Sequence, residues 1–183
     1  MQIIIIGIFA LAVVFLIGIF NHLVRLRFLV KEAWSDIDVQ LKKRHDLIPN
    51  IVEVVKSYKE YEQRLFAQIT QLRSKAMANT TNIKEKSELE NQFSFGIKNL
   101  FALVEAYPDL KANKNFLDLQ KTLIRIENDI EMARRYYNGT VRNLNTAVET
   151  FPSNLVSFAF HFKSADFFEI EYATERQVPD VKI

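Results

Sequence analysis

Histidine, cysteine and carboxylate side chains most often perform catalysis or hold metal ions, and this chain carries few of them in useful patterns. It has 183 residues, three histidines and no cysteine. None of His22, His45 and His161 has a glutamate three residues before it, so the Glu-x-x-His pairs of di-metal helical bundles are absent from the sequence. Zinc sites with thiolate ligands are excluded as well.

The one polar cluster that could do chemistry is His45 with its neighbours Arg44 and Asp46, shortly before Pro49. It has two interpretations: a structural polar layer or solvated kink, which we favour, and a ligand or metal site. Asp36 and Asp38 point away from each other on a helix, so they do not form a paired acid and base. No phosphate-binding glycine loop or G-x-S-x-G element occurs. We therefore predict no enzyme, no cofactor, no metal and no small-molecule substrate.

A long apolar run at the start of the chain predicts that this part of the protein lies in a membrane. Residues 3–20 read IIIIGIFALAVVFLIGIF and carry no charge. As a helix they cover about 27 Å, close to the ~30 Å hydrocarbon core of a bilayer. A cleaved signal peptide would need a basic segment ahead of the run, and a lipoprotein anchor would need a cysteine. We predict a permanent transmembrane anchor in residues 1–22, with lipid-facing side chains Ile3, Ile4, Ile5, Ile6, Phe9, Leu11, Val13, Val14, Phe15, Leu16, Ile17, Ile19 and Phe20.

The charges around the anchor predict its orientation. Arg25, Arg27 and Lys31 follow the apolar run closely, whereas only the terminal amine precedes it. The positive-inside rule then places the N-terminus outside and the body in the cytoplasm, at a bacterial inner membrane crossed once. The basic residues would contact anionic headgroups of the bilayer. The net charge of +2 gives no reason to expect nucleic acid as a partner.

The rest of the chain predicts long helices, since it has few glycines and prolines to interrupt them. Apolar residues recur at steps of three and four from Leu26 to Ala76, from Leu89 to Val104 and from Phe116 to Phe151. The last stripe has the seven-residue recurrence of coiled-coil packing. Pro49 predicts a kink or break in the first stripe. No strand-like alternation of any length precedes the C-terminal tail.

These stripes predict an all-α fold: an N-terminal transmembrane helix leading into an antiparallel up-and-down bundle of three long helices and a short C-terminal helix. The predicted divisions are an anchor (1–22), a cytoplasmic helical bundle (23–155) and a Phe-rich tail (156–183). Residues 79–82 offer N-caps for the second long helix, and Ser153 or Asn154 for the short one. Gly139, inside the last long helix, suggests close packing there.

The tail gathers five phenylalanines, which allow two interpretations. We favour aromatic side chains that close the open end of the bundle core. The alternative is an amphipathic element in the membrane interface or against a neighbouring subunit. The five are Phe158, Phe160, Phe162, Phe167 and Phe168.

Several segments spread over almost the whole chain together resemble the LemA family of bacterial membrane-anchored proteins. They are residues 21–27 (NHLVRLR), 32–44 (EAWSDIDVQLKKR), 46–50 (DLIPN), 104–113 (VEAYPDLKAN), 136–138 (YYN) and 151–154 (FPSN). The resemblance implies a helical bundle on one N-terminal span, and structural roles for Trp34, Pro49, Tyr107, Pro108, Asp109, Asn113, Phe151 and Pro152. It implies no established enzymatic activity, and a magnetosome-associated relative suggests by analogy a part in membrane organisation.

The sequence therefore favours a non-enzymatic, membrane-anchored helical scaffold at the cytoplasmic membrane face. Its expected partners are the bilayer and either further copies of itself or other membrane proteins. The alternative is a ligand- or metal-binding membrane protein with a polar site near Arg44 and His45.

Overall fold

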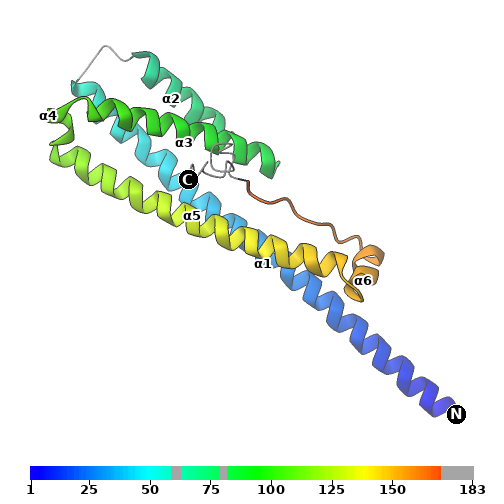
Figure 1. Ribbon diagram of the computed structural model, residues 1–183. Helices are drawn as coiled ribbons and strands as arrows, with labels where there is room; N and C mark the ends of the chain where they lie inside the picture. The colour runs from blue at the N-terminus through cyan, green and yellow to red at the C-terminus, as the bar shows by residue number, and fades with distance from the viewer. Residues whose placement is uncertain (59–62, 79–81, 170–183) are drawn as a thin grey trace, which may run out of the picture. The chain divides into compact units, whose positions relative to one another are not determined.

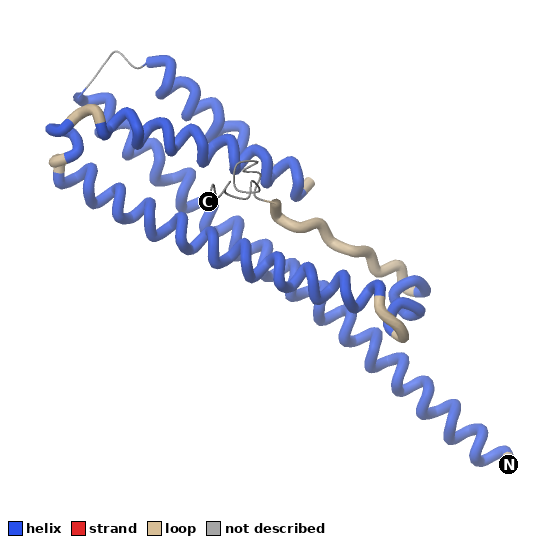
Figure 2. The backbone as a smooth tube through the Cα atoms, in the orientation of Figure 1, coloured by secondary structure: helices blue, strands red, loops and turns tan. Residues whose placement is uncertain are grey.

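The computed structural model of the protein describes residues 1–58, 63–78 and 82–169. The regular elements of these ranges are all helices, with no strand among them (Figures 1 and 2), which confirms the all-α class. The helices are α1 (Gln2–Tyr58), α2 (Gln63–Ala76), α3 (Ile83–Glu105), α4 (Pro108–Lys111), α5 (Lys114–Glu149) and α6 (Ser153–Ala159).

Two compact units share the two longest helices. The anchor unit comprises residues 1–40 and 129–167, and so contains the apolar run, the second half of α5 and α6. The core unit comprises residues 41–128 and 168–183, described as far as residue 169. It contains the second part of α1, α2, α3, α4 and the first part of α5.

In the anchor unit, α1 packs along α5 through the apolar stripe that the sequence predicts. Leu23, Ala33 and Ile37 are fully buried on α1, and Tyr137 and Val141 are fully buried on α5. The indole of Trp34 meets the Tyr137 ring edge-on, with 5.5 Å between ring centroids. Such pairs add stabilisation beyond the area that they bury.

In the core unit, α2 packs along α3 over a contiguous apolar cluster (Figure 1). Gly96 of α3 permits a close approach of the two helices, because a Cβ there would lie 3.0 Å from Leu72 Cδ1. The close packing that we expected at Gly139 is wrong, since a Cβ there would meet nothing within 4 Å. The cluster consists of Ile48, Ile51, Val52, Val55, Phe66, Ile69, Ala76, Phe93, Ile97, Leu100, Val104, Leu110, Phe116 and Leu123.

The predicted end caps of the helices are correct in one case and wrong in the other. The side chain of Asn82 caps α3, as its Oδ1 accepts from the backbone N–H of Lys84 at 3.0 Å. Neither Ser153 nor Asn154 caps α6, because the residue at that position is Pro152 and no side chain bonds the helix start. The Ser153 hydroxyl donates instead to the carbonyl of Thr150, at 3.0 Å.

Helix α1 continues through Pro49 to Tyr58, so of the kink or break that we expected at this proline, the break does not occur. A proline inside a helix removes the N–H that would bond the carbonyl four residues earlier, here that of His45. Arg73 of α2 replaces this donor, because its Nε bonds the His45 carbonyl at 2.7 Å. A carbonyl without a partner would cost about 1–3 kcal/mol when buried, and the arginine removes that cost.

The same bond shows that the chain folds back between α1 and α2. In one straight helix, residues 45 and 73 would lie about 42 Å apart. The apolar stripe from Leu26 to Ala76 therefore belongs to two helices, α1 and α2, and not to one.

We expect the energetic effect of Arg73 to depend on Pro49. Arg73→Met is expected to lower stability by about 1–2 kcal/mol, because it leaves the His45 carbonyl unbonded. In the Pro49→Ala background the new alanine supplies the missing N–H, so the same change is expected to cost about 1 kcal/mol less. Thermal unfolding of the full chain in detergent, followed by circular dichroism, measures the four variants of this cycle.

Lys75→Met is the matched control, since Lys75 is an exposed cation near the end of the same helix. The small effect of Lys75→Met on stability is expected to be equal with Pro49 and with Pro49→Ala. Equal costs of Arg73→Met with and without Pro49 would contradict this account of the proline.

Candidate functional site

The first candidate site is the end of the anchor unit that carries the apolar run. In the described ranges, α1 is the one helix long and apolar enough to cross a membrane, and none of its apolar window is buried. The predicted anchor side chains Ile3, Ile4, Ile5, Ile6, Phe9, Leu11, Val13, Val14, Phe15, Leu16 and Ile17 are all exposed, and Ile19 and Phe20 are half-buried. Apolar side chains exposed around a helix are unfavourable in water, so this part of α1 requires an apolar environment such as a membrane.

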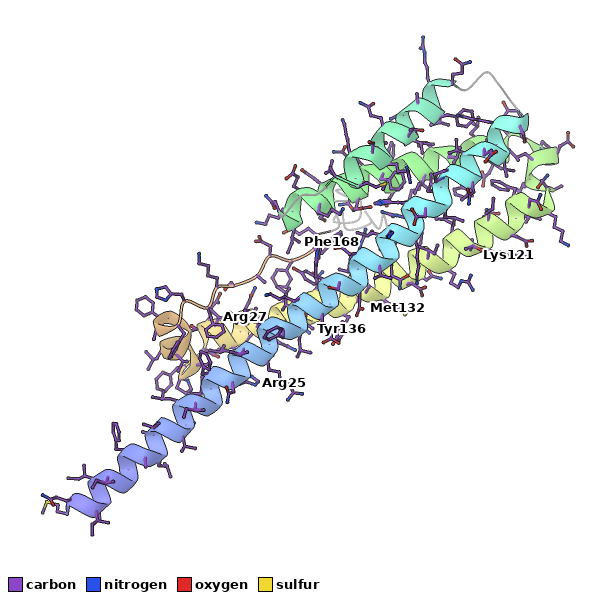
Figure 3. The ribbon with its side chains drawn as sticks, turned by 180° about the vertical axis from the view of Figure 1, so that it is seen from behind. Arg25, Arg27, Lys121, Met132, Tyr136 and Phe168 are labelled. Carbon is purple, nitrogen blue, oxygen red and sulfur yellow. The ribbon has the colours of Figure 1, made fainter. Side chains whose placement is uncertain are left out.

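Basic side chains begin where the apolar run ends. Arg25, Arg27 and Lys31 are all exposed (Figure 3 labels the two arginines). The Arg27 guanidinium lies over the Phe162 ring, 5.2 Å from its centroid, and Lys31 Nζ lies 5.6 Å from the centroid of Phe28. These cations therefore stay hydrated at their ends while their stems lie on aromatic surface.

Helix α6 lies against the end of the apolar run through aromatic contacts. The Phe20 and Phe160 rings are 4.8 Å apart between centroids, and the Phe20 and Phe162 rings are 5.7 Å apart. An apolar groove of about 420 Å³ separates the two helices nearby. Its walls are Val13, Leu16, Ile17 and Phe20 from α1, and Leu155, Val156 and Ala159 from α6 with its C-cap residue Phe160.

Hydrogen bonds hold α6 and its end in place. The Ser157 hydroxyl donates to the Val148 carbonyl of α5 at 2.8 Å. At the C-terminus of the helix, His161 takes a positive φ of 56°, and the N–H of Phe162 bonds the carbonyl of Ser157 at 2.9 Å. This six-to-one bond and the left-handed residue before it form a Schellman motif, which satisfies carbonyls at the end of α6.

An extended segment after α6 is clamped to α5 by two side chains. Asn145 bonds both backbone groups of Ala165: its Oδ1 accepts from the N–H at 2.8 Å, and its Nδ2 donates to the carbonyl at 3.0 Å. The Tyr137 hydroxyl donates to the carbonyl of Asp166 at 2.9 Å. Burial, with the nearby Asp166 charge, raises the pKa of Tyr137 to about 12, so the phenol stays a donor at neutral pH.

The phenylalanines of the tail do not share one environment. Phe168 is buried in the core unit, whereas Phe158, Phe160 and Phe167 are exposed and Phe162 is half-buried. Closure of the bundle core therefore describes Phe168 alone. The exposure of the other phenylalanines needs a different explanation.

The second candidate site is a buried polar network in the core unit around Arg44. The Arg44 side chain is fully buried and forms an ion pair with the buried Glu90. Its Nη1 bonds Ser94 Oγ at 2.8 Å and Glu127 Oε1 at 3.1 Å. The guanidinium also lies 5.3 Å from the centroid of the Phe93 ring. Arg44 thus joins α1 to α3 and α5.

His45 extends this network from the next position of α1. Its Nε2 lies 3.2 Å from the Glu90 carboxylate, and its ring meets Phe93 edge-on. Burial by itself would raise the pKa of Glu90, but the His45 hydrogen bond and the Arg44 charge outweigh it and hold the pKa below its ordinary value. Glu90 is therefore a carboxylate at neutral pH and balances the buried cation.

This arrangement fits the structural polar layer that we favoured for Arg44 and His45. Its charges are directed at one another, as buried charges must be to offset their desolvation. In the described part of the chain, no group of three or more histidine and carboxylate side chains is arranged to hold a metal ion.

The remaining residues singled out by the family resemblance lie mostly at helix ends. Tyr107, Pro108 and Asp109 form the start of α4, and Asn113 Oδ1 accepts from the N–H of Phe116 at the start of α5. Phe151 is exposed, in contrast to its neighbour Pro152, which is half-buried.

Sequence reasoning missed three residues that make the specific contacts of these sites. Glu90 and Glu127 pair with Arg44 from 46 and 83 residues away, and Asn145 clamps a segment 20 residues further on. Glu90 had one visible signal, because it is a charge at a position where α3 turns its apolar face inward. The other two have no signal in the sequence pattern.

Comparisons with known proteins agree with the geometry. The model of the LemA family matches residues 33–183. The chain is 30% identical to "Protein LemA" of Metamycoplasma hominis over 81% of the chain and 72% of that protein. It is 20% identical to the magnetosome proteins MamQ 1 and MamQ 2 of Paramagnetospirillum magneticum, over 74% of the chain and 59% of each relative. The chain spans about three-fifths of the length of these two magnetosome proteins.

We expect the Arg44 network to be structural, which a pair of variants can test. Arg44→Met is expected to destabilise the full chain by about 3–5 kcal/mol, because it leaves the Glu90 carboxylate buried without its cation. Arg44→Met with Glu90→Met is expected to recover most of this loss, since both charges are then removed together. Denaturant unfolding in detergent, followed by circular dichroism, measures both.

The pH dependence gives an independent control. Because the folded pKa of Glu90 is lowered, its stabilisation is present above the ordinary pKa of 4.5 and is lost as the pH falls through the lower, folded pKa. We expect this acid-dependent loss to be weaker in the double variant. A double variant no more stable than Arg44→Met alone would contradict the structural role.

Proposed function

This chain belongs to the LemA family, and we propose that it is a non-enzymatic scaffold anchored in the inner membrane of a bacterium by one transmembrane helix. The N-terminal apolar helix and the relatives fit a membrane-associated helical protein.

The observation that carries the proposal is the continuity of α1. The helix runs from Gln2 to Tyr58, so the apolar run and the first helix of the folded body are one element. Its side chains are exposed up to Ile17 and become partly or fully buried from Ile19 onward at helical spacing. The change in environment therefore falls where the apolar run ends, as expected of a helix that leaves a bilayer and enters a protein.

The basic residues support the proposed orientation. Arg25, Arg27 and Lys31 all follow the apolar run within about 17 Å of helix rise. Juxtamembrane cations are retained on the cytoplasmic side and are attracted to its anionic lipids, by about 1 kcal/mol each. We therefore place the body in the cytoplasm and the N-terminus outside.

Exposed apolar side chains on the anchor unit support the scaffold role. Met132 is 60% exposed and Tyr136 is 50% exposed, one helical turn apart on α5 (both labelled in Figure 3). Methionine and tyrosine are common in surfaces that bind other proteins. We propose that this surface binds a second copy of the chain or another membrane protein.

The relatives support a role at membranes. Two of them are named as magnetosome proteins, and one as protein LemA. By analogy, we propose that this chain takes part in membrane organisation.

The topology can be tested by labelling single cysteines, because the natural chain has none. Gln2→Cys lies before the apolar run, and Lys121→Cys replaces a side chain that is 76% exposed on α5. In intact bacteria, a membrane-impermeant maleimide is expected to label position 2 and not position 121. After permeabilisation both are expected to react.

The cysteine-free parent chain is the control for background labelling. Labelling of position 121 in intact cells would contradict the proposed orientation. Equal labelling of both positions only after permeabilisation would contradict the transmembrane span.

The scaffold role can be tested with photoreactive benzoylphenylalanine at Met132 or Tyr136 of the full chain in cells. We expect irradiation to yield a discrete protein adduct at these positions, identified by mass spectrometry as a second copy or another membrane protein. The same group at Lys121 is the matched control on α5 (Figure 3) and is expected to give no discrete adduct. An absence of adducts at both test positions would contradict this binding surface.

A further inference from the structure

We propose that α6 and the turn after it form a second membrane contact, which lies in the bilayer leaflet beside the end of the transmembrane run. The occupant of this surface is lipid: acyl chains fill the groove between α6 and α1, and headgroups meet the basic side chains next to it. The inference rests on the proposed transmembrane anchor.

The residues that line the groove place α6 at the depth of the bilayer. Its wall on α1 runs from Val13 to Phe20, entirely within the apolar run. This stretch of helix rises by about 10 Å, or a third of the hydrocarbon thickness. Because Leu155 and Phe160 line the same groove, α6 lies beside the last turns of the apolar run and not beyond them.

The exposed side chains of this element are mostly apolar, as those of a surface in contact with lipid must be, and the exposed His161 stands at its end, next to Phe162 and Lys163 in the chain. Phe158 is 88% exposed, Phe151 79%, Leu155 62% and Phe160 61%. Four large apolar side chains so close in the chain form a patch of the kind that marks interaction sites on proteins. The groove lining is apolar on both walls, so an acyl chain matches it chemically.

The backbone at the end of this element is bonded within α6. In a bilayer, unsatisfied peptide groups cost several kcal/mol each, so segments that enter it must bond their own backbone. The N–H groups of Phe160, His161 and Phe162 all bond carbonyls of α6. The buried Ser157 hydroxyl has two carbonyl acceptors for its one hydrogen, those of Val148 at 2.8 Å and Asn154 at 3.0 Å.

Cations lie where the headgroups would be. Arg27 lies about 10 Å beyond Phe20 along α1, and its guanidinium lies over Phe162. Lys163, the next residue after Phe162, is exposed. Membrane elements that lie in the interface combine apolar side chains at the depth of the acyl chains with basic side chains at the depth of the headgroups. Anionic phospholipid is the lipid that matches such basic side chains.

Tryptophan fluorescence can test the contact, because the chain has a single tryptophan, Trp34. In a Trp34→Phe background, Phe158→Trp places the probe on α6. The full chain is reconstituted in vesicles of phosphatidylcholine and phosphatidylglycerol, with or without bromine on the acyl chains. We expect blue-shifted emission from position 158 and severalfold stronger quenching by brominated lipid than at a control position.

Two matched variants in the same background make the result decisive. Phe95→Trp replaces an exposed phenylalanine of α3 in the core unit and is expected to stay unquenched. Phe9→Trp lies in the middle of the apolar run and reports the anchor itself. Quenching at position 9 without quenching at 158 would overturn the second contact alone, whereas no quenching at position 9 would overturn the anchor.

A third outcome would identify a different occupant. Blue-shifted emission at position 158 without quenching would mean that protein, such as a second copy of the chain, covers the patch, and would overturn lipid as the occupant. If Phe158→Trp does not fold, Leu155→Trp on the same exposed surface provides the same measurement.

Discussion

The structure depends on one feature of α1: its apolar run is exposed, whereas its continuation is buried in the protein, so in the proposed membrane anchor one helix would satisfy two solvents. A helix can do this because its backbone bonds are internal, so only its side chains need to change at the boundary. In α1 the change occurs near Phe20, where an apolar run exposed on all sides gives way to a stripe buried at every third or fourth position. Helix α5 packs on the part of α1 beyond this point, through Trp34 and Tyr137, and α6 lies beside the last turns of the apolar run.

In the core unit, a second constraint is the burial of charged side chains. Arg44 and Glu90 would each cost several kcal/mol if buried alone, and their pairing offsets this cost only with good geometry. Such a pair favours one alignment of α1 against α3, because a shift of either helix by one residue separates the charges. Pro49 acts in the same region by freeing the His45 carbonyl for Arg73 of α2. Polar satisfaction therefore aligns helices whose apolar stripes alone would permit several registers.

Much of the fold could be predicted from the sequence because helical periodicity is a local signal, and two of the predicted stripes correspond to α3 and α5. The effect of Pro49 could not be predicted, because the donor that permits an unbroken helix comes from Arg73 in another helix. Glu127 was missed for the same reason, since a partner distant in sequence leaves no periodic trace. Amino-acid composition alone also could not predict which phenylalanines of the tail are buried. The structure buries Phe168 and exposes Phe158. After the turn at the end of α6, Asn145 and Tyr137 hold the chain to α5, and Phe168 follows this clamped segment.

A single transmembrane helix leaves its rotation and tilt undetermined unless interfacial residues fix them. In the anchor unit, Phe160 and Phe162 lie against Phe20, and Asn145 and Tyr137 fix the segment that follows to α5. These contacts connect the end of α6 to α1 and the segment after it to α5. In the proposed membrane contact, lipid against α6 would give the anchor unit a defined rotation about α1, and the partner surface proposed on α5 would then face one direction in the plane of the membrane.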